Sequence, residues 1–223
     1  MAVFSRLEVY KTMEAHPVVP VFYHKEIHIV KQVVKACYDG GIRVFEFTNR
    51  GDFAHEIFAQ LIPWATKQFP DLVIGVGSII DSSTATLFMQ CGANFVVGPI
   101  LNAEVAKVCN RRQIGYIPGC GSATEVNYAQ ELGVEIVKIF PAGNVGGPSF
   151  VKNILGPMPW SKVMVTGGVT TEADNLKAWF KNGVSCVGIG SNLFPKEIIE
   201  AENWEQITTN CREVFEVIST NKG

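Results

Sequence analysis

Residues 27–47, IHIVKQVVKACYDGGIRVFEF, decide the fold, because they contain the pattern of a helix, a turn and a strand in succession. In the first part, apolar residues recur roughly every three or four positions, which places them on one face of a helix. Gly40 and Gly41 follow, and glycine is typical of the turn that ends a helix. The last part, Arg43–Phe47, is a short apolar and aromatic run that predicts a strand.

The same pattern recurs along the rest of the chain. Glycine again ends predicted helices at Cys91-Gly92-Ala93, Glu131-Leu132-Gly133 and Lys181-Asn182-Gly183. A strand-like run returns roughly every 20–30 residues, and regular alternation of helix and strand favours a parallel sheet. The runs are Val18–Tyr23, Arg43–Phe47, Leu72–Gly77, Asn94–Gly98, Gly115–Pro118, Glu135–Phe140, Lys162–Thr166 and Val184–Ile189. About eight such units predict a closed (β/α)8 TIM barrel of the α/β class, with an open doubly wound sheet as the alternative.

Two further helices are expected outside the repeated units. Phe4, Leu7, Tyr10 and Met13 share helical spacing and predict an extra, amphipathic N-terminal helix over one mouth of the barrel. Residues 204–218 have the same kind of spacing and predict a closing helix. No linker, low-complexity tract or block of charge divides residues 1–223, so the sequence predicts a single domain.

Composition excludes several classes of function. The 223 residues carry a formal net charge of −2, which provides no electrostatic footprint for nucleic acid or an anionic membrane. No stretch is apolar enough to span a bilayer, and residues 1–15 lack the apolar core of a signal peptide. The cysteines are scattered without metal-ligand spacing and predict reduced thiols in a cytoplasmic protein. His24 and His28 lack a carboxylate at a suitable spacing, so no metal site is predicted.

Two charged residues interrupt apolar strands. Because side chains alternate along a strand, Phe45 and Phe47 should face the outer helices, which turns Glu46 into the barrel. By the same alternation Lys138 points inward between two apolar neighbours. Both residues lie near the C-terminal ends of their strands, where the active sites of such barrels lie.

An inward lysine and carboxylate allow two interpretations. As a structural feature they form a buried ion pair, although such pairs seldom recover the free energy lost on dehydration. As a catalytic pair, Lys138 is a nucleophile and Glu46 transfers protons. Burial lowers the pKa of a lysine toward the neutral form that attacks a ketone, whereas a nearby carboxylate raises that pKa. The catalytic interpretation requires the effect of burial to dominate.

Polar residues and glycines after other strands complete a candidate site. Arg50, just past the strand of Glu46, can bind a substrate carboxylate through two parallel hydrogen bonds, and Ser78 can add a hydroxyl. Glycine-rich turns follow the last two strands, at Thr166-Gly167-Gly168 and Gly188-Ile189-Gly190-Ser191. Amides of such turns bind anions, and the phosphate site of these barrels is often built there. The turns therefore predict a phosphorylated small molecule as ligand.

Several short motifs occur together in this chain. The most specific combination is Glu46-Phe47-Thr48-Asn49-Arg50 with Lys138-Ile139-Phe140-Pro141-Ala142. The others are Pro17-Val18-Val19-Pro20-Val21, Gly75-Val76-Gly77-Ser78, Ile117-Pro118-Gly119 and Thr166-Gly167-Gly168-Val169. From about Pro17 to Phe194, the chain thus resembles the 2-keto-3-deoxy-6-phosphogluconate (KDPG) aldolase family, which includes 4-hydroxy-2-oxoglutarate (KHG) aldolases.

The resemblance implies a class I (Schiff-base) aldolase, a carbon–carbon lyase that needs no cofactor and no metal. It would cleave KDPG to pyruvate and glyceraldehyde 3-phosphate, and/or KHG to pyruvate and glyoxylate, and would form a homotrimer. Lys138 would form the Schiff base with the 2-keto acid, and Glu46 would be the general acid and base. The other implied roles are carboxylate binding by Arg50 and Ser78, pocket lining by Pro99, Phe140 and Thr166, and phosphate binding by Gly167, Gly168, Gly190 and Ser191.

The chain departs from the family pattern beside the predicted site. It has Gly98-Pro99-Ile100 where Ser-Pro-Gly is expected, Cys120-Gly121-Ser122-Ala123 after Gly119, and Ser78 where threonine is frequent. The sequence therefore leaves open which aldol is the substrate and which configuration at C4 is preferred. A phosphate-binding isomerase or epimerase, and a non-catalytic barrel that binds a sugar phosphate, are the alternative functions.

Overall fold

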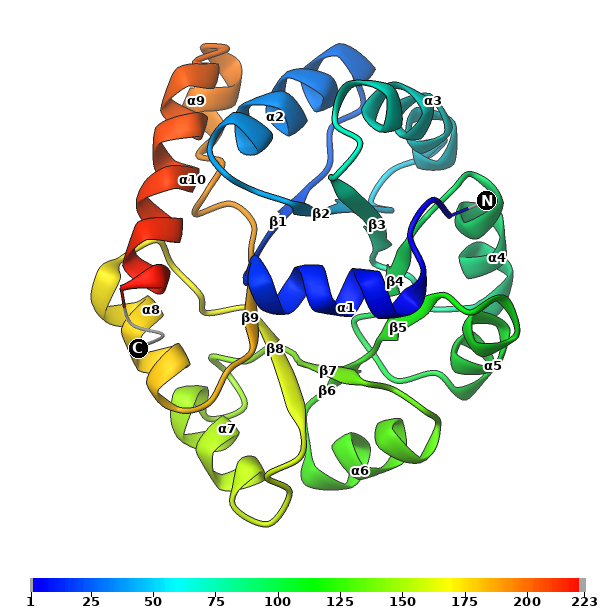
Figure 1. The fold of residues 1–223 in the computed structure, drawn as a ribbon, viewed down its shortest axis with the longest axis vertical. Helices are drawn as coiled ribbons and strands as arrows, with labels where there is room; N and C mark the ends of the chain where they lie inside the picture. Colours follow the sequence, from blue (N-terminus) through cyan, green and yellow to red (C-terminus); the bar gives the residue numbers. More distant parts are fainter. Residues whose placement is uncertain (1, 221–223) are drawn as a thin grey trace.

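The structure is a computed structural model that describes residues 2–220. It consists of a ring of parallel strands surrounded by helices (Figure 1). The strands are β1 Val18–Phe22, β2 Val44–Thr48, β3 Val73–Gly77, β4 Phe95–Val97, β5 Gly115–Ile117, β6 Gly119–Cys120, β7 Ile136–Ile139, β8 Lys162–Thr166 and β9 Cys186–Ile189. The helices are α1 Arg6–Ala15, α2 Ile27–Asp39, α3 Ala54–Gln68, α4 Ser82–Gln90, α5 Ala103–Arg112, α6 Ala123–Glu131, α7 Gly147–Leu155, α8 Ala173–Lys181, α9 Lys196–Glu200 and α10 Trp204–Ser219.

The barrel closes through one interrupted strand. The strand order is β5-β4-β3-β2-β1-β9-β8-β7-β6, so β5 and β6 stand at its two ends, yet only Pro118 separates them in the chain. The Pro118 carbonyl accepts a hydrogen bond from the backbone amide of Lys138 at 3.0 Å, and Gly119 is the register partner of Lys138. β5 and β6 therefore act as one barrel strand. The predicted (β/α)8 TIM barrel is confirmed, and the open sheet is not formed.

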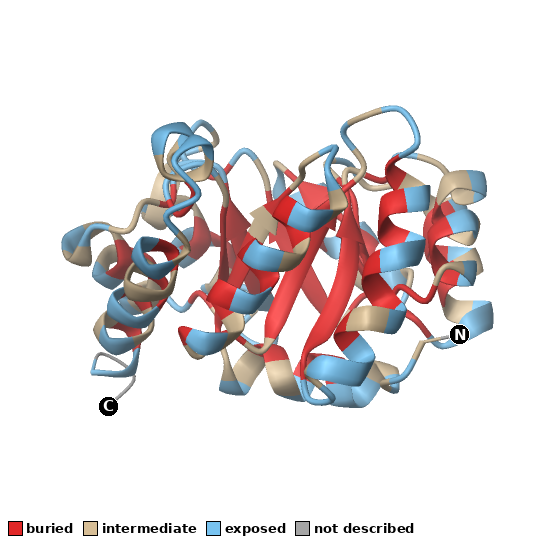
Figure 2. Cartoon of the chain, turned by 90° about the horizontal axis from the view of Figure 1, so that it is seen from above, coloured by how far each residue is buried: buried red, intermediate tan, exposed pale blue. Residues whose placement is uncertain are grey.

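Alternation along the strands separates an outer from an inner apolar core. Phe45 and Phe47 belong to the outer core, where the Phe47 ring lies 5.6 Å from that of Phe58 on α3. Val44, on the opposite face of β2, belongs to the inner core inside the ring. Figure 2 shows the strands buried within the layer of helices. Glu46 shares the inner face with Val44, as the sequence predicted.

The helix α1 covers the mouth at the N-terminal ends of the strands, as predicted (Figure 1). A capping box begins it, because Ser5 Oγ accepts from the Glu8 amide and Glu8 Oε2 accepts from the Ser5 amide. The prediction that Leu7 faces the barrel is wrong: its side chain is 67% exposed, and Val9 is buried instead. Steps of three residues fall short of a full helical turn by about 60°, so a stripe spaced only by threes drifts off the buried face.

The predicted closing helix is α10, which packs between α2 and α8. Its buried residues are Ile207, Cys211, Val214 and Ile218. None of the helices within residues 2–220 is both long and apolar enough to cross a membrane.

The side chain of Asn94, immediately before β4, holds the segment before α1 by hydrogen bonds. It is 3% exposed, and its Oδ1 accepts hydrogen bonds from the amides of Val3 at 2.9 Å and Phe4 at 3.1 Å. Its Nδ2 donates to the Ile74 carbonyl at 2.9 Å. The substitution Asn94→Leu is expected to lower the free energy of unfolding by about 2–4 kcal/mol, because it leaves two amides without their acceptor.

Urea unfolding measures this effect. The exposed Asn153 on α7 provides a matched control, and Asn153→Leu is expected to change the free energy of unfolding by less than about 0.5 kcal/mol. Equal losses in the two variants would contradict the role assigned to Asn94.

Candidate active site

A hollow of about 260 Å³ lies at the C-terminal ends of the barrel strands. Strand residues and the loops that follow the strands contribute to its wall. The lining residues are Val21, Glu46, Arg50, Ser78, Pro99, Lys138, Phe140, Thr166, Gly167, Gly168, Val169, Gly188, Gly190, Ser191 and Asn192. All eleven site residues predicted from the sequence are among them, so the fold brings together side chains that lie up to 145 positions apart in the chain (46 to 191).

The structure adds four lining residues to the predicted set. Gly188 lies in a glycine-rich turn that the sequence already indicates, and Val21 follows from alternation, because Val19 two residues earlier belongs to the inner core. Asn192 is different: its Nδ2 donates to the Val169 carbonyl at 3.0 Å and joins the two glycine-rich turns. Nothing in the local sequence marks such a contact between loops.

Lys138 and Glu46 are buried in the wall of this hollow. Lys138 is 6% exposed and Glu46 is 1% exposed. Lys138 Nζ lies 4.9 Å from the centre of the Phe140 ring, so the amine rests against an aromatic surface. Among the described residues Glu46 Oε2 has no hydrogen-bond partner, and no ion pair joins the carboxylate to the amine. The two side chains are therefore available to a ligand.

Burial shifts the pKa of each of these two groups toward its neutral form. It lowers the pKa of Lys138, an effect that the Glu46 charge opposes and the Arg50 charge reinforces. Burial likewise raises the pKa of Glu46, and the charges of Lys138 and Arg50 oppose that rise. The net shift of the lysine pKa is downward, which is the direction that the catalytic interpretation requires.

Arg50 and Ser78 stand together on the rim of the hollow. Arg50 Nε donates to Ser78 Oγ at 3.3 Å, although the two residues follow different strands. Ser78 has φ 61°, so its backbone turns sharply at the end of β3. A guanidinium held by a hydroxyl beside a buried lysine can bind the carboxylate of a 2-keto acid.

Two strand glycines make room for the buried polar side chains. A Cβ at Gly77 would overlap Glu46 Oε1, so the carboxylate lies over the bare backbone of β3. A Cβ at Gly188 would overlap the Thr166 methyl group, so that methyl group packs on β9. These glycines permit Glu46 and Thr166 to fit inside the barrel.

The two glycine-rich turns form the far side of the hollow. Gly167 and Gly168 have φ of 79° and 90°, values that glycine adopts without strain. The Gly167 carbonyl accepts from the Gly143 amide at 2.8 Å, and the Gly190 carbonyl accepts from the Leu193 amide at 2.9 Å. The turns are thus anchored by their carbonyls, as an anion site built from backbone amides requires.

Three buried polar atoms near this end of the barrel have no hydrogen-bond partner in the described part of the chain: Glu46 Oε2, Thr48 Oγ1 and Thr166 Oγ1. Buried polar groups are normally hydrogen-bonded, and exceptions mark places where a ligand or water binds. Glu46 and Thr166 line the hollow directly, so both residues border the space that a ligand or water would occupy.

Metal-binding side chains do not cluster in the described residues. Within 2–220 no group of three or more histidine, cysteine, aspartate or glutamate side chains could hold a metal ion. His24 Nδ1 instead accepts a hydrogen bond from the Glu26 amide at 3.0 Å.

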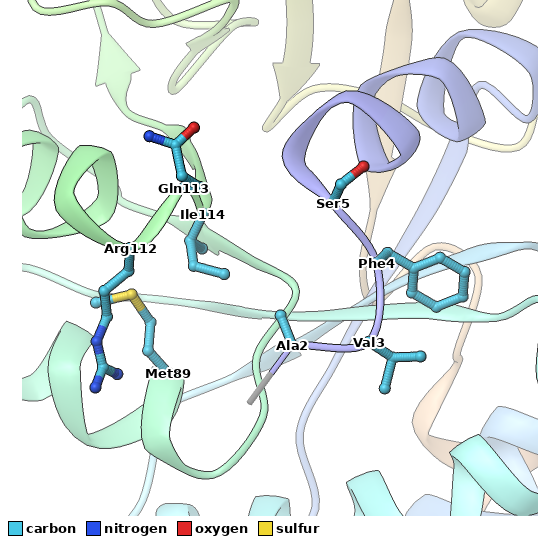
Figure 3. Close-up of a pocket in the computed structure, with 8 residues that line it drawn as sticks. All are labelled: Ala2, Val3, Phe4, Ser5, Met89, Arg112, Gln113 and Ile114. Atoms are coloured by element: carbon cyan, nitrogen blue, oxygen red, sulfur yellow. The ribbon is translucent and has the colours of Figure 1, made fainter.

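A second hollow, of about 440 Å³, lies beside the segment that precedes α1 (Figure 3). Among its described lining residues only Arg112 carries an ionisable side chain. The lining residues are Ala2, Val3, Phe4, Ser5, Met89, Arg112, Gln113 and Ile114. Without a lysine or a carboxylate among these residues, this hollow offers no counterpart to the chemistry of Lys138 and Glu46.

A lysine buried at the C-terminal end of a barrel strand, with its pKa lowered, can form an imine with a ketone. With an uncommitted carboxylate in the same wall to move protons, this arrangement is that of a class I aldolase. The family model described as KDPG and KHG aldolase matches residues 9–210, and the chain belongs to this family.

Individual relatives agree with the family assignment. The 2-dehydro-3-deoxy-phosphogluconate aldolase of Pseudomonas aeruginosa is 34% identical over 179 residues, 79% of this chain and 78% of the relative. The KHG/KDPG aldolase of Escherichia coli is 29% identical over 201 residues, 90% of this chain and 91% of the relative. A crystal structure of Legionella pneumophila KDPG aldolase, with pyruvate captured as a covalent carbinolamine, superposes with a TM-score of 0.82 at 32% identity, covering 91% of this chain and 96% of that one.

Proposed function

We propose that this chain cleaves KDPG, KHG or both to pyruvate and an aldehyde through a Schiff base on Lys138. The observation that carries the proposal is the buried Lys138, with its lowered pKa, in one hollow with an uncommitted Glu46 carboxylate. The names of the relatives from Pseudomonas aeruginosa and Escherichia coli support the choice of substrates.

Lys138 is the nucleophile of the proposed reaction. Its neutral amine attacks the C2 carbonyl of the keto acid, and loss of water from the carbinolamine produces an iminium ion. The iminium accepts the electron pair of the C3–C4 bond when that bond breaks. Because the iminium is the electron sink, the proposed chemistry includes no metal and no organic cofactor.

Glu46 moves the protons. Its carboxylate takes the proton of the C4 hydroxyl as the C3–C4 bond breaks, which releases the aldehyde and leaves an enamine on Lys138. The same carboxyl group then returns the proton to C3 of the enamine, and hydrolysis of the imine releases pyruvate. The raised pKa of Glu46 suits this double use, because the group must both accept and donate a proton.

The remaining lining residues fix the two ends of the substrate. Arg50 and Ser78 bind the carboxylate next to the reacting carbonyl, and Pro99, Phe140 and Thr166 line the middle of the pocket. Across the hollow, backbone amides of the glycine-rich turns bind the phosphate of KDPG. The residues assigned to the phosphate are Gly167, Gly168, Gly190 and Ser191. With KHG as substrate, the carboxylate at its other end would occupy this anion site.

We further propose that residues 1–223 act as one aldolase domain in a cytoplasmic homotrimer. The family match over 9–210 supports the single domain, and the free cysteines support a reducing compartment. Phe53, Ile80 and Ile100 support contact with further copies, because they are 67%, 56% and 52% exposed on three successive loops.

Trapping of the imine tests the proposed function. Incubation with pyruvate and sodium borohydride is expected to reduce the imine to a stable secondary amine, which appears as a mass increase of the intact protein. Peptide mapping should place the adduct on Lys138, with the exposed Lys152 as the internal control. No adduct on the folded protein at saturating pyruvate would refute the proposal and favour a phosphate-binding isomerase or a non-catalytic barrel.

A further inference from the structure

Thr48, at the C-terminal end of β2, buries a hydroxyl group that the proposed reaction has not used. Its side chain is 1% exposed, and Oγ1 has no hydrogen-bond partner among the described residues. Phe45 and Phe47 face the outer core, so alternation places Thr48 on the inner face together with Glu46. The hydroxyl therefore lies inside the barrel, on the strand that carries the proposed acid and base.

The position of Gly77 shows how near the Glu46 carboxylate lies to Thr48. Gly77 is the register partner of Thr48 on β3, and side chains of such partners start about 5 Å apart. Glu46 Oε1 occupies the place that a Cβ of Gly77 would take. The Glu46 side chain therefore extends along β2 toward its C-terminal end, and its carboxylate lies beside Thr48, at about 5 Å from the Thr48 Cβ. One bridging water molecule would be enough to span that separation.

Packing alone does not explain a threonine at this place. Val44, on the same face of β2, fills its part of the inner core with a side chain of the same shape and no polar atom. Burying a hydroxyl without a partner costs free energy, and valine would avoid that cost. A hydrogen-bond partner that the Thr48 hydroxyl gains when substrate and water are bound would explain why threonine is present here.

We propose that Thr48 is a positioning residue, whose hydroxyl holds the Glu46 carboxylate through one water molecule in the orientation that exchanges protons with the substrate. The inference rests on the proposed function, because it concerns the group assigned to proton transfer. No proton is gained or lost in the cycle: Glu46 takes one from the C4 hydroxyl and returns it to C3 of the enamine. Thr48 itself touches neither the substrate nor Lys138.

Deuterium exchange at the methyl group of pyruvate isolates this step. Pyruvate bound as the imine loses and regains a C3 proton through Glu46, so incubation in D2O measures proton transfer without any aldehyde. The variant Thr48→Val removes the hydroxyl and keeps the shape, and it is expected to slow exchange about tenfold. Trapping with borohydride at saturating pyruvate should stay at the wild-type level, because the lysine is untouched.

The pH dependence of exchange separates positioning from packing. A hydrogen bond to a carboxylate favours its charged form, so losing it should raise the pKa of Glu46 and move the acid limb of the profile to higher pH. The other charged groups that act on Glu46, Lys138 and Arg50, are unchanged in the variant. Thr48→Ser, which restores the hydroxyl, should recover most of the rate and the wild-type pH profile.

A second pair of variants tests the hydroxyl in a smaller side chain. Thr48→Ala and Thr48→Ser both lack the methyl group, and only the serine keeps the oxygen, so serine should exchange about tenfold faster. Equal exchange rates in Thr48→Val and Thr48→Ser, or in Thr48→Ala and Thr48→Ser, would overturn the inference while leaving the proposed function intact. Failure of the wild-type protein to give a Lys138 adduct would instead overturn the proposed function and the inference with it.

Discussion

Lys138→Met is expected to lower kcat for KDPG or KHG cleavage by about 10⁴-fold or more and to abolish trapping of pyruvate by borohydride. Methionine fills a similar volume but provides no amine for an imine. The protein should nevertheless remain folded, because methionine fills the buried position without a charge that needs hydration. Steady-state kinetics, trapping and urea unfolding of the same preparation measure all three quantities.

The exposed Lys152 on α7 provides the matched control for this variant. Lys152→Met removes the same charge from the surface and should leave kcat and trapping at their wild-type values. If Lys138→Met kept a tenth of the wild-type kcat, the imine would not be the route of the reaction.

Glu46→Gln is expected to lower kcat by about 10²–10⁴-fold while imine formation persists. The amide keeps the size of the carboxylate in the space over Gly77 but cannot accept and return the proton. The charge of Glu46 raises the pKa of Lys138, so its removal should lower that pKa further. Neutral amine then exists at lower pH, and the pH at which half of the protein is trapped with pyruvate should move downward.

Kinetics and trapping over a range of pH check both parts of this prediction. Glu56→Gln, on the exposed face of α3, removes a carboxylate outside the hollow and should change neither. A shift of the trapping midpoint to higher pH in Glu46→Gln would contradict the electrostatic coupling between Glu46 and Lys138.

Alternation within single strands was enough to orient the reactive side chains from the sequence. Phe45 and Phe47 had to face the helices, and this placed Glu46 inside the barrel. The same reasoning placed Lys138 inside. The glycine-rich turns were equally visible, because glycine at the end of a late barrel strand is a local pattern. Local rules of this kind depend only on neighbouring residues, and the structure places Glu46, Lys138 and the glycine-rich turns in one hollow.

Features that depend on contacts between distant segments could not be derived in this way. The hydrogen bond from Asn192 to Val169 joins two loops, and the space over Gly77 is filled by Glu46 from a different strand. The interruption at Pro118 shows that the same limit on sequence-based prediction applies even within a single predicted strand. Proline has no amide hydrogen to donate, so the ladder breaks there, but only the closed ring shows that the two pieces belong to one barrel strand.

That interruption divides the protein into two half-barrels with different tasks. The half before Pro118 carries Glu46, Arg50 and Ser78, which we propose to move the proton and bind the carboxylate, while the half after it carries Lys138 and the glycine-rich turns. The halves meet where β1 pairs with β9 and again at the junction of β5 and β6, beside the Lys138 backbone. Each half alone therefore carries only part of the candidate site, and closure of the ring during folding also brings the two parts together.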